Sequence, residues 1–327
     1  MIWVIGDIHG MFDPLKRLLT QIQVFHYRSP EYMKIKKLIF IGDYIDHGPS
    51  SKEVIDYITD LPFEKIFLMG NHEDLMLQFI ENSDLYQNYG NVWFRGNGGQ
   101  RTVNSFFPKK HLLDRDEEDF ERDQFQLSEK YYNFFKTLKI SHTEVIGDLK
   151  FSFVHAGLNP DFPIDEQLSL KNFDEFHAWR KANKVWIEDT LLWIRDEPTK
   201  RFGDRIIVHG HTPTTNLTHS YKKLHGYDPA LALPFFKFET REEDDDYPIE
   251  FADEGYSGYS YSGNYETLIS INVDTGAVYG KRLTALGINE EDISEGGGKY
   301  DVYQICVDKG YRLATDTVNT DIILTEV

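Results

Sequence analysis

The sequence contains very little cysteine, with Cys306 the single example among 327 residues. One thiol excludes an internal disulfide, and we expect a protein of the reducing cytoplasm. Long apolar runs are missing too, since no stretch approaches the ~18 consecutive apolar residues of a membrane span. The first residues have no basic segment and reach a charged residue at Asp7, unlike a secretory signal peptide. We therefore expect no membrane association and no secretion.

Positive charge is also scarce. The chain has 35 Lys and Arg against 54 Asp and Glu, a net charge of −19. A broad nucleic-acid surface normally carries the opposite sign, so this acidity argues against non-specific DNA or RNA binding. An anionic substrate is still allowed, because bound metal ions can reverse the sign of a site locally. The apolar fraction of 40% is enough for a sizeable core and excludes wholesale disorder.

Short apolar runs alternate with helical patterns in the first half of the chain. Strands are predicted at 2–5, 38–41 and 66–69, and apolar residues at helical spacing follow the first two. Strand signals return at 149–154, 205–208 and 268–273. This alternation predicts a layered α/β fold.

We treat residues 1–327 as a single domain with two insertions. Residues 74 to about 145 have a mostly helical pattern and predict a helical insertion or cap. Residues 216 to about 265 combine acidic runs with a Gly, Tyr and Ser stretch, and predict a long surface loop. Residues from about 266 to 327 are expected to supply C-terminal strands that complete the sheet.

Five predicted strands end in residues that bind metals. Sites in layered α/β sheets gather at the carboxyl ends of strands, so we expect these residues to form one cluster. Their Asp, Asn and His side chains suit Mn, Fe, Zn or Mg. Each segment alone is a weak signal, whereas the ordered set is a strong one. The segments are Gly6-Asp7-Ile8-His9-Gly10, Gly42-Asp43-Tyr44-Ile45-Asp46-His47-Gly48, Gly70-Asn71-His72-Glu73, His155-Ala156-Gly157 and His209-Gly210-His211-Thr212.

This set resembles the calcineurin-like metallophosphoesterases, and within them the phosphoprotein phosphatase branch with its pattern GDxHG, GDxxDRG, GNHE, HG or HA, and GH. Bacterial and phage protein phosphatases and diadenosine tetraphosphatases are the members it is most similar to. Pro213 stands where the other broad branch has a further histidine, which favours the phosphatase branch. The resemblance implies a two-sheet β-sandwich flanked by helices. Further matches are Trp93, Gly98-Gly99, Thr102 and residues 191–195, 209–213 and 271–280.

The resemblance also implies two divalent metal ions per chain, with manganese as the first choice and iron or zinc as alternatives. Asp7 and His9 would hold the first ion, and Asp43 would bridge both ions. The second ion would be completed by Asn71, His155 and His211.

The catalytic roles follow from the same resemblance. A metal-bound hydroxide would attack the phosphorus directly, with His72 as general acid on the leaving oxygen and Asp46 orienting it. Arg195 would clamp the phosphate, with Arg201 and Arg205 as nearby competitors. The sequence departs from the family at His47, where the pattern has an arginine that helps hold the phosphate.

The function that we expect is hydrolysis of phosphomonoesters, on phosphorylated proteins (Ser, Thr or Tyr) or on small phosphoesters. The alternative enzyme is a bis(5'-nucleosyl)-tetraphosphatase-type hydrolase of dinucleoside polyphosphates, which uses the same motifs. The third hypothesis is a metal-stabilised binding module whose phosphate clamp has decayed at His47. The intact ligand set and the His72–Asp46 pair disfavour this last hypothesis.

Overall fold

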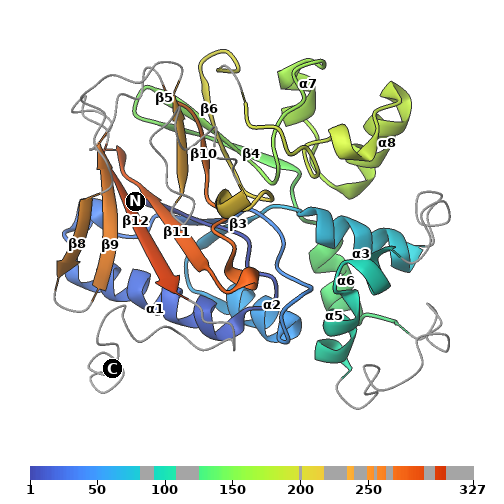
Figure 1. Ribbon diagram of the computed structural model, residues 1–327, viewed down its shortest axis with the longest axis horizontal. Helices are drawn as coiled ribbons and strands as arrows, with labels where there is room; N and C mark the ends of the chain where they lie inside the picture. Colours follow the sequence, from blue (N-terminus) through green and yellow to red (C-terminus); the bar gives the residue numbers. More distant parts are fainter. Residues whose placement is uncertain are drawn as a thin grey trace.

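Two β-sheets pack against each other and helices cover their outer sides (Figure 1). The computed structural model describes residues 1–81, 92–107, 125–198, 201–216, 234–238, 249–253, 256–262, 268–290 and 299–306. The larger sheet has seven strands in the order β3-β2-β1-β11-β12-β9-β8, and the smaller has five in the order β4-β5-β6-β10-β7. This is the mixed α/β, two-sheet architecture that the resemblance implied.

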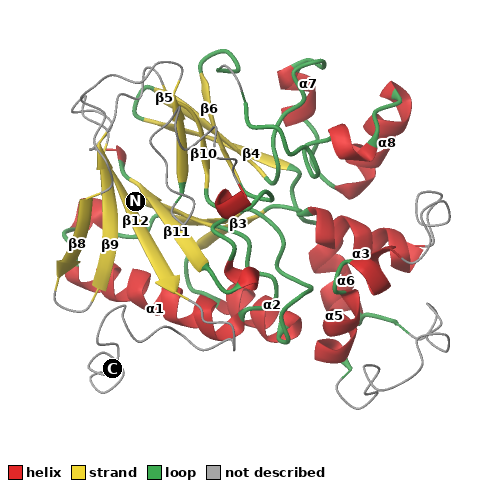
Figure 2. Cartoon of the chain, in the orientation of Figure 1, coloured by secondary structure: helices red, strands yellow, loops and turns green. Residues whose placement is uncertain are grey.

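Strands and helices alternate along residues 1–81, and Figure 2 colours the helices red and the strands yellow. The seven-stranded sheet consists of β1 (Ile2–Ile5), β2 (Lys37–Phe40), β3 (Glu64–Phe67), β8 (Ile249–Asp253), β9 (Tyr256–Ser262), β11 (Arg282–Ile288) and β12 (Lys299–Cys306). The five-stranded sheet consists of β4 (Ser141–Ile146), β5 (Leu149–Val154), β6 (Arg205–His209), β7 (Phe235–Phe238) and β10 (Leu268–Asn272). The α-helices are α1 (Phe12–Arg28), α2 (Ser51–Asp60), α3 (Asn71–Glu81), α5 (Gly99–Phe106), α6 (Glu129–Lys136), α7 (Ile164–Leu168) and α8 (Phe173–Asn183). Shorter turns are η1 (Glu31–Met33), the π-helical η2 (Val92–Gly96), η7 (Ile187–Asp189), η8 (Thr214–Asn216) and η10 (Ala277–Tyr279).

The period of two along each strand divides the apolar residues between two cores. Val4 and Ile39 point from the large sheet into a core that they share with Phe151 and Ile206 of the small sheet. Their sequence neighbours point to the opposite face, where Trp3 packs in a core with helical residues such as Phe25. Strands buried on both faces have near-continuous apolar sequences, which explains why β1 and β2 were easy to predict.

Helix α1 lies across the outer face of the large sheet, against β11 and β12 (Figure 1). It buries Leu15, Leu18, Leu19, Ile22 and Phe25, whose spacing of three and four residues places them on one side of the helix. Helices α3, α5 and α6 gather beside the sheets, where α3 packs on α6 and η2, and α5 packs on α2 and η2. These helices fall within or next to the segment 74–145 that was predicted to be a helical cap. The acidic run at 114–121 lies outside the described residues.

Each sheet contains three neighbouring strands that run in parallel. In the large sheet β1, β2 and β3 run in parallel, and in the small sheet β5, β6 and β10 do so. The carboxyl ends of parallel strands lie at the same edge of a sheet, so six strand ends are available to form a site.

Residues 216–265 differ from the predicted surface loop. The structure places β7 in the small sheet, while β9 pairs with β12 and β8 pairs with β9 in the large one. The stretch 256–262 alternates tyrosine with small residues, and tyrosine favours strands when a neighbouring strand offers a partner. Its glycine, serine and acidic surroundings gave the composition of a loop, and the pairing with distant β12 is not visible in the local sequence. The rest of 216–265 lies outside the described residues.

Among the described residues, no helix is both long and apolar enough to cross a membrane.

Candidate metal centre and catalytic pair

Every predicted metal ligand follows the carboxyl end of a parallel strand. Asp7 and His9 follow β1, Asp43 follows β2, and Asn71 begins α3 after β3. In the small sheet, His155 directly follows β5 and His211 follows β6. The structure therefore brings together side chains that are up to 204 residues apart, as shown by the 3.0 Å hydrogen bond from His211 N–H to Asp7 Oδ2.

The backbone at this site is strained. Among the described residues, six non-glycine residues have positive φ, and only Lys184 lies away from the site. Each such residue costs on the order of 1–3 kcal/mol, so strain concentrated here indicates that the positions of these side chains matter for function. The other five are His9 (49°), Asp43 (51°), Asp46 (70°), His47 (56°) and His211 (67°).

Two flanking glycines leave space for the carboxylates. A Cβ on Gly70 would lie 2.1 Å from Asp43 Oδ1, and one on Gly210 would lie 2.3 Å from Asp7 Oδ1. Real side chains never approach so closely, so any other residue at either position would displace a carboxylate.

One group of donor atoms combines both sheets. Backbone carbonyls fix the tautomers of its two imidazoles, because a carbonyl can only accept: His155 Nδ1 faces Ile41 O at 2.9 Å, and His211 Nε2 faces Trp193 O at 3.1 Å. The unprotonated nitrogens, His155 Nε2 and His211 Nδ1, each lie 2.9 Å from Asn71 Oδ1. His155 Nε2 is also 3.5 Å from Asp43 Oδ1. Lone pairs that face one another at this distance fit a cation between them.

A second group of possible metal-ligand atoms follows strands of the large sheet alone. His9 Nδ1 faces Ile45 O at 3.1 Å, which leaves Nε2 unprotonated and 3.4 Å from Asp43 Oδ2. The third member is Asp7, whose Oδ1 is buried with no hydrogen-bond partner. A buried carboxylate oxygen without a partner is costly unless a cation pairs with it. The atoms offered by Asp7, His9 and Asp43 lie within 4.8 Å of one another, as do those of Asp43, His155 and His211.

Burial, reinforced at Asp7 and Asp43 by neighbouring carboxylates, raises the pKa values of the carboxyl groups at this site. Burial, followed by the charges of nearby carboxylates, raises the pKa of Asp7 well above its usual range. The same two causes raise the pKa of Asp43 in the same way, with Glu73 as the largest source of charge. Burial also raises the pKa of Asp274, which follows β10, to about 6. A divalent cation would favour the charged forms and remove this penalty, so the residues present fit two metal positions that share Asp43.

His72 and Asp46 form a buried pair beside the metal positions. His72 Nδ1 lies 2.7 Å from Asp46 Oδ2, and the same oxygen accepts a 2.8 Å hydrogen bond from the Trp93 indole N–H. The Thr102 hydroxyl donates to Asp46 Oδ1. Burial raises the pKa of Asp46 to about 8 and lowers the pKa of the His72 ring, so a proton held by this pair belongs to both groups.

The three arginines that are candidates for binding the phosphate differ in their contacts. Arg201 donates to Leu268 O at 2.7 Å, and Arg205 pairs with Asp165 at 2.9 Å, so both guanidinium groups have partners elsewhere. Arg195 is exposed. Burial is the largest cause that lowers the pKa of His155 and of His211, neighbouring histidines add to it, and the positive charge of Arg195 lowers both values further. Of the three arginines, Arg195 is the one whose charge affects the pKa of these histidines.

His47 lies at the same edge. Its half-buried ring has its centroid 5.1 Å from that of His9 and 5.0 Å from that of His72. Burial lowers the pKa of this imidazole, which makes it a weak substitute for the permanent charge of an arginine.

The prediction from sequence missed the role of Glu73. Its buried carboxylate accepts four backbone N–H groups: those of Gly70 (3.0 Å) and Asp43 (2.9 Å) at Oε2, and those of Tyr44 (2.9 Å) and Ile45 (3.2 Å) at Oε1. Glu73 thus fixes the loop that carries Asp43 to the start of α3. Burial raises its pKa to about 7 despite these bonds. Its place at the end of Gly70-Asn71-His72-Glu73 was a signal, but only the fold shows which N–H groups it binds.

Comparison with known proteins gives an independent view of the same residues. The profile of the calcineurin-like phosphoesterase family matches residues 1–242. A serine/threonine-protein phosphatase 2 of Escherichia coli is 30% identical over 184 residues, which are 56% of this chain and 69% of that protein.

Two further relatives are named for another substrate. A symmetrical bis(5'-nucleosyl)-tetraphosphatase of Aromatoleum aromaticum is 23% identical over 310 residues, covering 89% of this chain and 95% of that protein. An asymmetrical bis(5'-nucleosyl)-tetraphosphatase of Anoxybacillus flavithermus is 24% identical over 213 residues, covering 64% of this chain and 78% of that protein.

The burial of carboxylates at the site predicts an unusual stability effect for Asp43→Asn. The amide removes one buried charge and its Oδ1 still accepts from His72 N–H, so the metal-free variant should melt at a higher temperature than the unmodified protein. The stabilisation by Mn²⁺, about 2.7 kcal/mol at a hundredfold excess over Kd, should shrink. Thermal unfolding in EDTA and in Mn²⁺ measures both effects. The control is Asp60→Asn at the exposed end of α2. A lower metal-free melting temperature with an undiminished gain from Mn²⁺ would contradict this account.

Glu73→Gln should destabilise the protein, because the amide NH₂ would face backbone N–H groups that need an acceptor. Leaving these donors unpaired costs on the order of 2 kcal/mol. Urea unfolding at fixed metal concentration measures the difference in free energy. The matched control is Glu81→Gln on the same helix, where the side chain pairs with Lys136 and Tyr132 at the surface and the expected loss is about 0–1 kcal/mol. Equal losses in the two variants would show that Glu73 does not hold the loop.

Proposed function

The chain belongs to the calcineurin-like phosphoesterase family, and from this premise we propose that it is a metal-dependent phosphatase acting on phosphomonoesters of serine, threonine or tyrosine in phosphorylated proteins. Its membership makes it a phosphoesterase, a hydrolase. The proposal concerns the substrate, the metal and the roles of single residues. Manganese is the metal that we propose, and the cytoplasm is the proposed compartment, since the chain has a single cysteine.

One observation carries the proposal: the proton-holding pair and both metal positions meet at Asp43. The backbone N–H of His72 donates to Asp43 Oδ1 at 3.2 Å, and the ring nitrogen Nε2 of His72 lies 3.9 Å from Asp43 Oδ2. The other ring nitrogen is held by Asp46, so Nε2 is the atom directed at the metal side. A general acid must lie within reach of the leaving oxygen, and this arrangement supports that role for His72.

The other residues have roles that follow from their contacts. When bound, the two divalent cations supply positive charge for the phosphoryl oxygens and a water acidic enough to act as nucleophile. Asp7 and His9 would hold the first cation, Asp43 would bridge, and Asn71, His155 and His211 would hold the second. Asp46 keeps the His72 ring in place and is itself held by Trp93 and Thr102. Arg195 and His47 would bind the phosphate.

Dinucleoside polyphosphates are the second candidate substrate class. A relative that this chain covers over 95% of its length is named a symmetrical bis(5'-nucleosyl)-tetraphosphatase. The phosphatase relative is more similar in sequence, at 30% identity, but shares a shorter segment. Both classes present a phosphorus centre to the same set of residues, so the motifs alone do not separate them.

A direct comparison of substrates separates the two classes. The Mn²⁺-loaded protein would be assayed on phosphoserine, phosphothreonine and phosphotyrosine peptides and on diadenosine tetraphosphate. The proposal expects a higher kcat/KM for at least one phosphopeptide. A kcat/KM at least tenfold higher for diadenosine tetraphosphate would assign the second class instead.

His72→Asn tests the general acid. The loss of kcat should be ~10²–10⁴-fold on phosphoserine, a poor leaving group, and much smaller on p-nitrophenyl phosphate, whose leaving group departs without a proton. Steady-state kinetics on both substrates measure the ratio. Losses of equal size on both would remove the general-acid role from His72.

His47→Arg tests the phosphate contact. A guanidinium offers a permanent charge and two parallel donors, so KM for a small phosphomonoester in Mn²⁺ should fall by ~3–30-fold, the effect of one charge-assisted hydrogen bond. An unchanged KM for every substrate tested would show that residue 47 does not contact the phosphate.

A further inference from the structure

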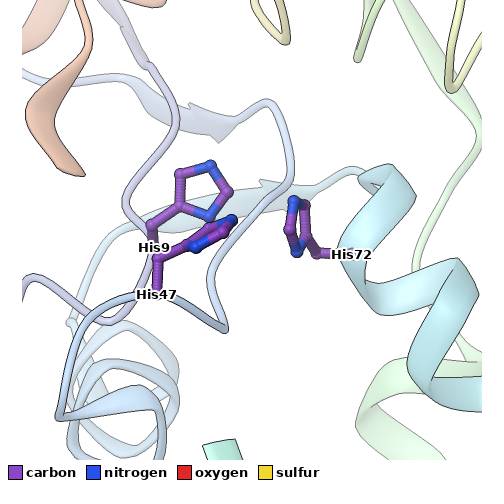
Figure 3. Close-up of side chains that lie close together, drawn as sticks. All are labelled: His9, His47 and His72. Atoms are coloured by element: carbon purple, nitrogen blue, oxygen red, sulfur yellow. The ribbon is translucent and has the colours of Figure 1, made fainter. Parts of the chain in front are cut away.

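Three histidines face a common space at the edge of the site. Figure 3 shows His9 and His47 extending from two neighbouring loops, and His72 approaching from α3 on the opposite side. The ring centroids of His9 and His72 are 4.7 Å apart, and His47 is 5.1 and 5.0 Å from them. His9 and His72 are buried and His47 is half-buried, so their nitrogens are poorly solvated.

Each of the two buried rings has one nitrogen directed away from its protein partner. His9 Nδ1 faces Ile45 O and His72 Nδ1 lies against Asp46, while the Nε2 atoms of both rings are directed toward Asp43 Oδ2, at 3.4 and 3.9 Å. His47 supplies the third nitrogen, and the three ligand atoms lie within 4.8 Å of one another. These rings already meet two requirements of a metal ligand, a fixed tautomer and a second partner that orients the ring.

The distances are close to those of a bound ion. Nitrogens around a tetrahedral Zn²⁺, with Zn–N distances of ~2.0–2.1 Å, are about 3.4 Å apart. The three ligand atoms lie within 4.8 Å of one another, so a contraction of at most about 1.4 Å reaches this spacing, and rotation of the half-buried His47 side chain can supply part of it. Three imidazoles favour Zn²⁺, Co²⁺ or Ni²⁺ over Mn²⁺ or Mg²⁺, which prefer carboxylate oxygens.

The group of His9, His47 and His72 and the group of Asp7, His9 and Asp43 share one ligand atom, His9 Nε2. His9 belongs to both, because its Nε2 lies 3.4 Å from Asp43 Oδ2 and is also grouped with the nitrogens of His47 and His72, and this one lone pair can bind only one cation. The chemistry of the cation therefore selects the position: an oxygen-preferring ion goes to Asp7 and Asp43, and a nitrogen-preferring ion goes to His47 and His72.

We propose that His9, His47 and His72 form an inhibitory binding site for a nitrogen-preferring divalent cation such as Zn²⁺, an alternative to the position at Asp7 and Asp43. A cation there takes the Nε2 lone pair of His72 and blocks the phosphate position at His47. It also withdraws His9 from the other position. The inhibitory consequence rests on the proposed roles of these residues, whereas the binding site itself does not.

Binding is tested without any substrate, by titrating the metal-free protein with Co²⁺ and recording its visible spectrum. Four-coordinate Co²⁺ with nitrogen ligands absorbs much more strongly than six-coordinate Co²⁺ with oxygen ligands. His47→Asn and His47→Arg should both lose a large part of the intense absorption and bind Co²⁺ more than ~10-fold more weakly at this position, since even indirect partners of a metal are worth ~10–100-fold. His142→Gln, on β4 and paired with Glu144, is the control for a histidine outside the site and should match the unmodified protein. Spectra and affinities that are unchanged in both His47 variants would overturn the proposal.

Inhibition is tested next, with Zn²⁺ added to the Mn²⁺-loaded protein at a fixed ratio of substrate to KM. The inhibiting Zn²⁺ concentration should rise with Mn²⁺ concentration, and it should rise more than tenfold in both His47 variants but not in His142→Gln. Equal inhibition of all four proteins would overturn the inhibitory role. A protein that binds Co²⁺ as expected but hydrolyses no phosphoester would instead overturn the proposed function and leave the binding site standing.

Discussion

The burial of several carboxylates at one edge of the two sheets is the constraint on which this structure depends. Asp7, Asp43 and Asp274 follow three strands in two sheets, and each is buried with its pKa raised. A protein interior tolerates such a group only with compensating positive charge. The free oxygen of Asp7 and the unprotonated nitrogens of His9, His155 and His211 mark where that charge belongs. Burying these carboxylates therefore destabilises the metal-free protein, and bound divalent cations would remove this cost. Metal affinity and the free energy of unfolding should for that reason change together.

The rest of the molecule holds these groups in place despite that cost. Parallel strands bring the residues to one edge, and backbone strain at five positions turns the side chains inward. Glu73 uses its own carboxylate to bind four backbone N–H groups, which ties the loop of Asp43 to α3. Asp46 does the same for His72, with Trp93 and Thr102 as its donors. One carboxylate therefore holds the loop of Asp43, the proposed metal bridge, and another holds His72, the proposed proton donor.

Much of this arrangement could be predicted from the sequence, because buried parallel strands are continuous apolar runs and the ligands directly follow them. Strands β1, β2, β5, β6 and β10 lie within one residue of the predicted limits, and β3 lies two residues earlier. The strands in 216–265 could not be predicted, since β9 is defined by its pairing with β12 some 40 residues later. Glu73 was missed for a similar reason, because its partners are backbone groups that carry no sequence signal. The meeting of His47 with His9 and His72 likewise depends on loop geometry, while the resemblance to the family presented His47 only as a missing arginine.

The account is tested most directly by anomalous X-ray scattering from crystals of the protein grown with Mn²⁺. Two peaks are predicted, one among Asp7, His9 and Asp43 and the other among Asp43, Asn71, His155 and His211. Their shared ligand would confirm that the buried carboxylates are compensated by two cations. The absence of any peak at Asp43, or a single ion bound elsewhere on the chain, would contradict the account.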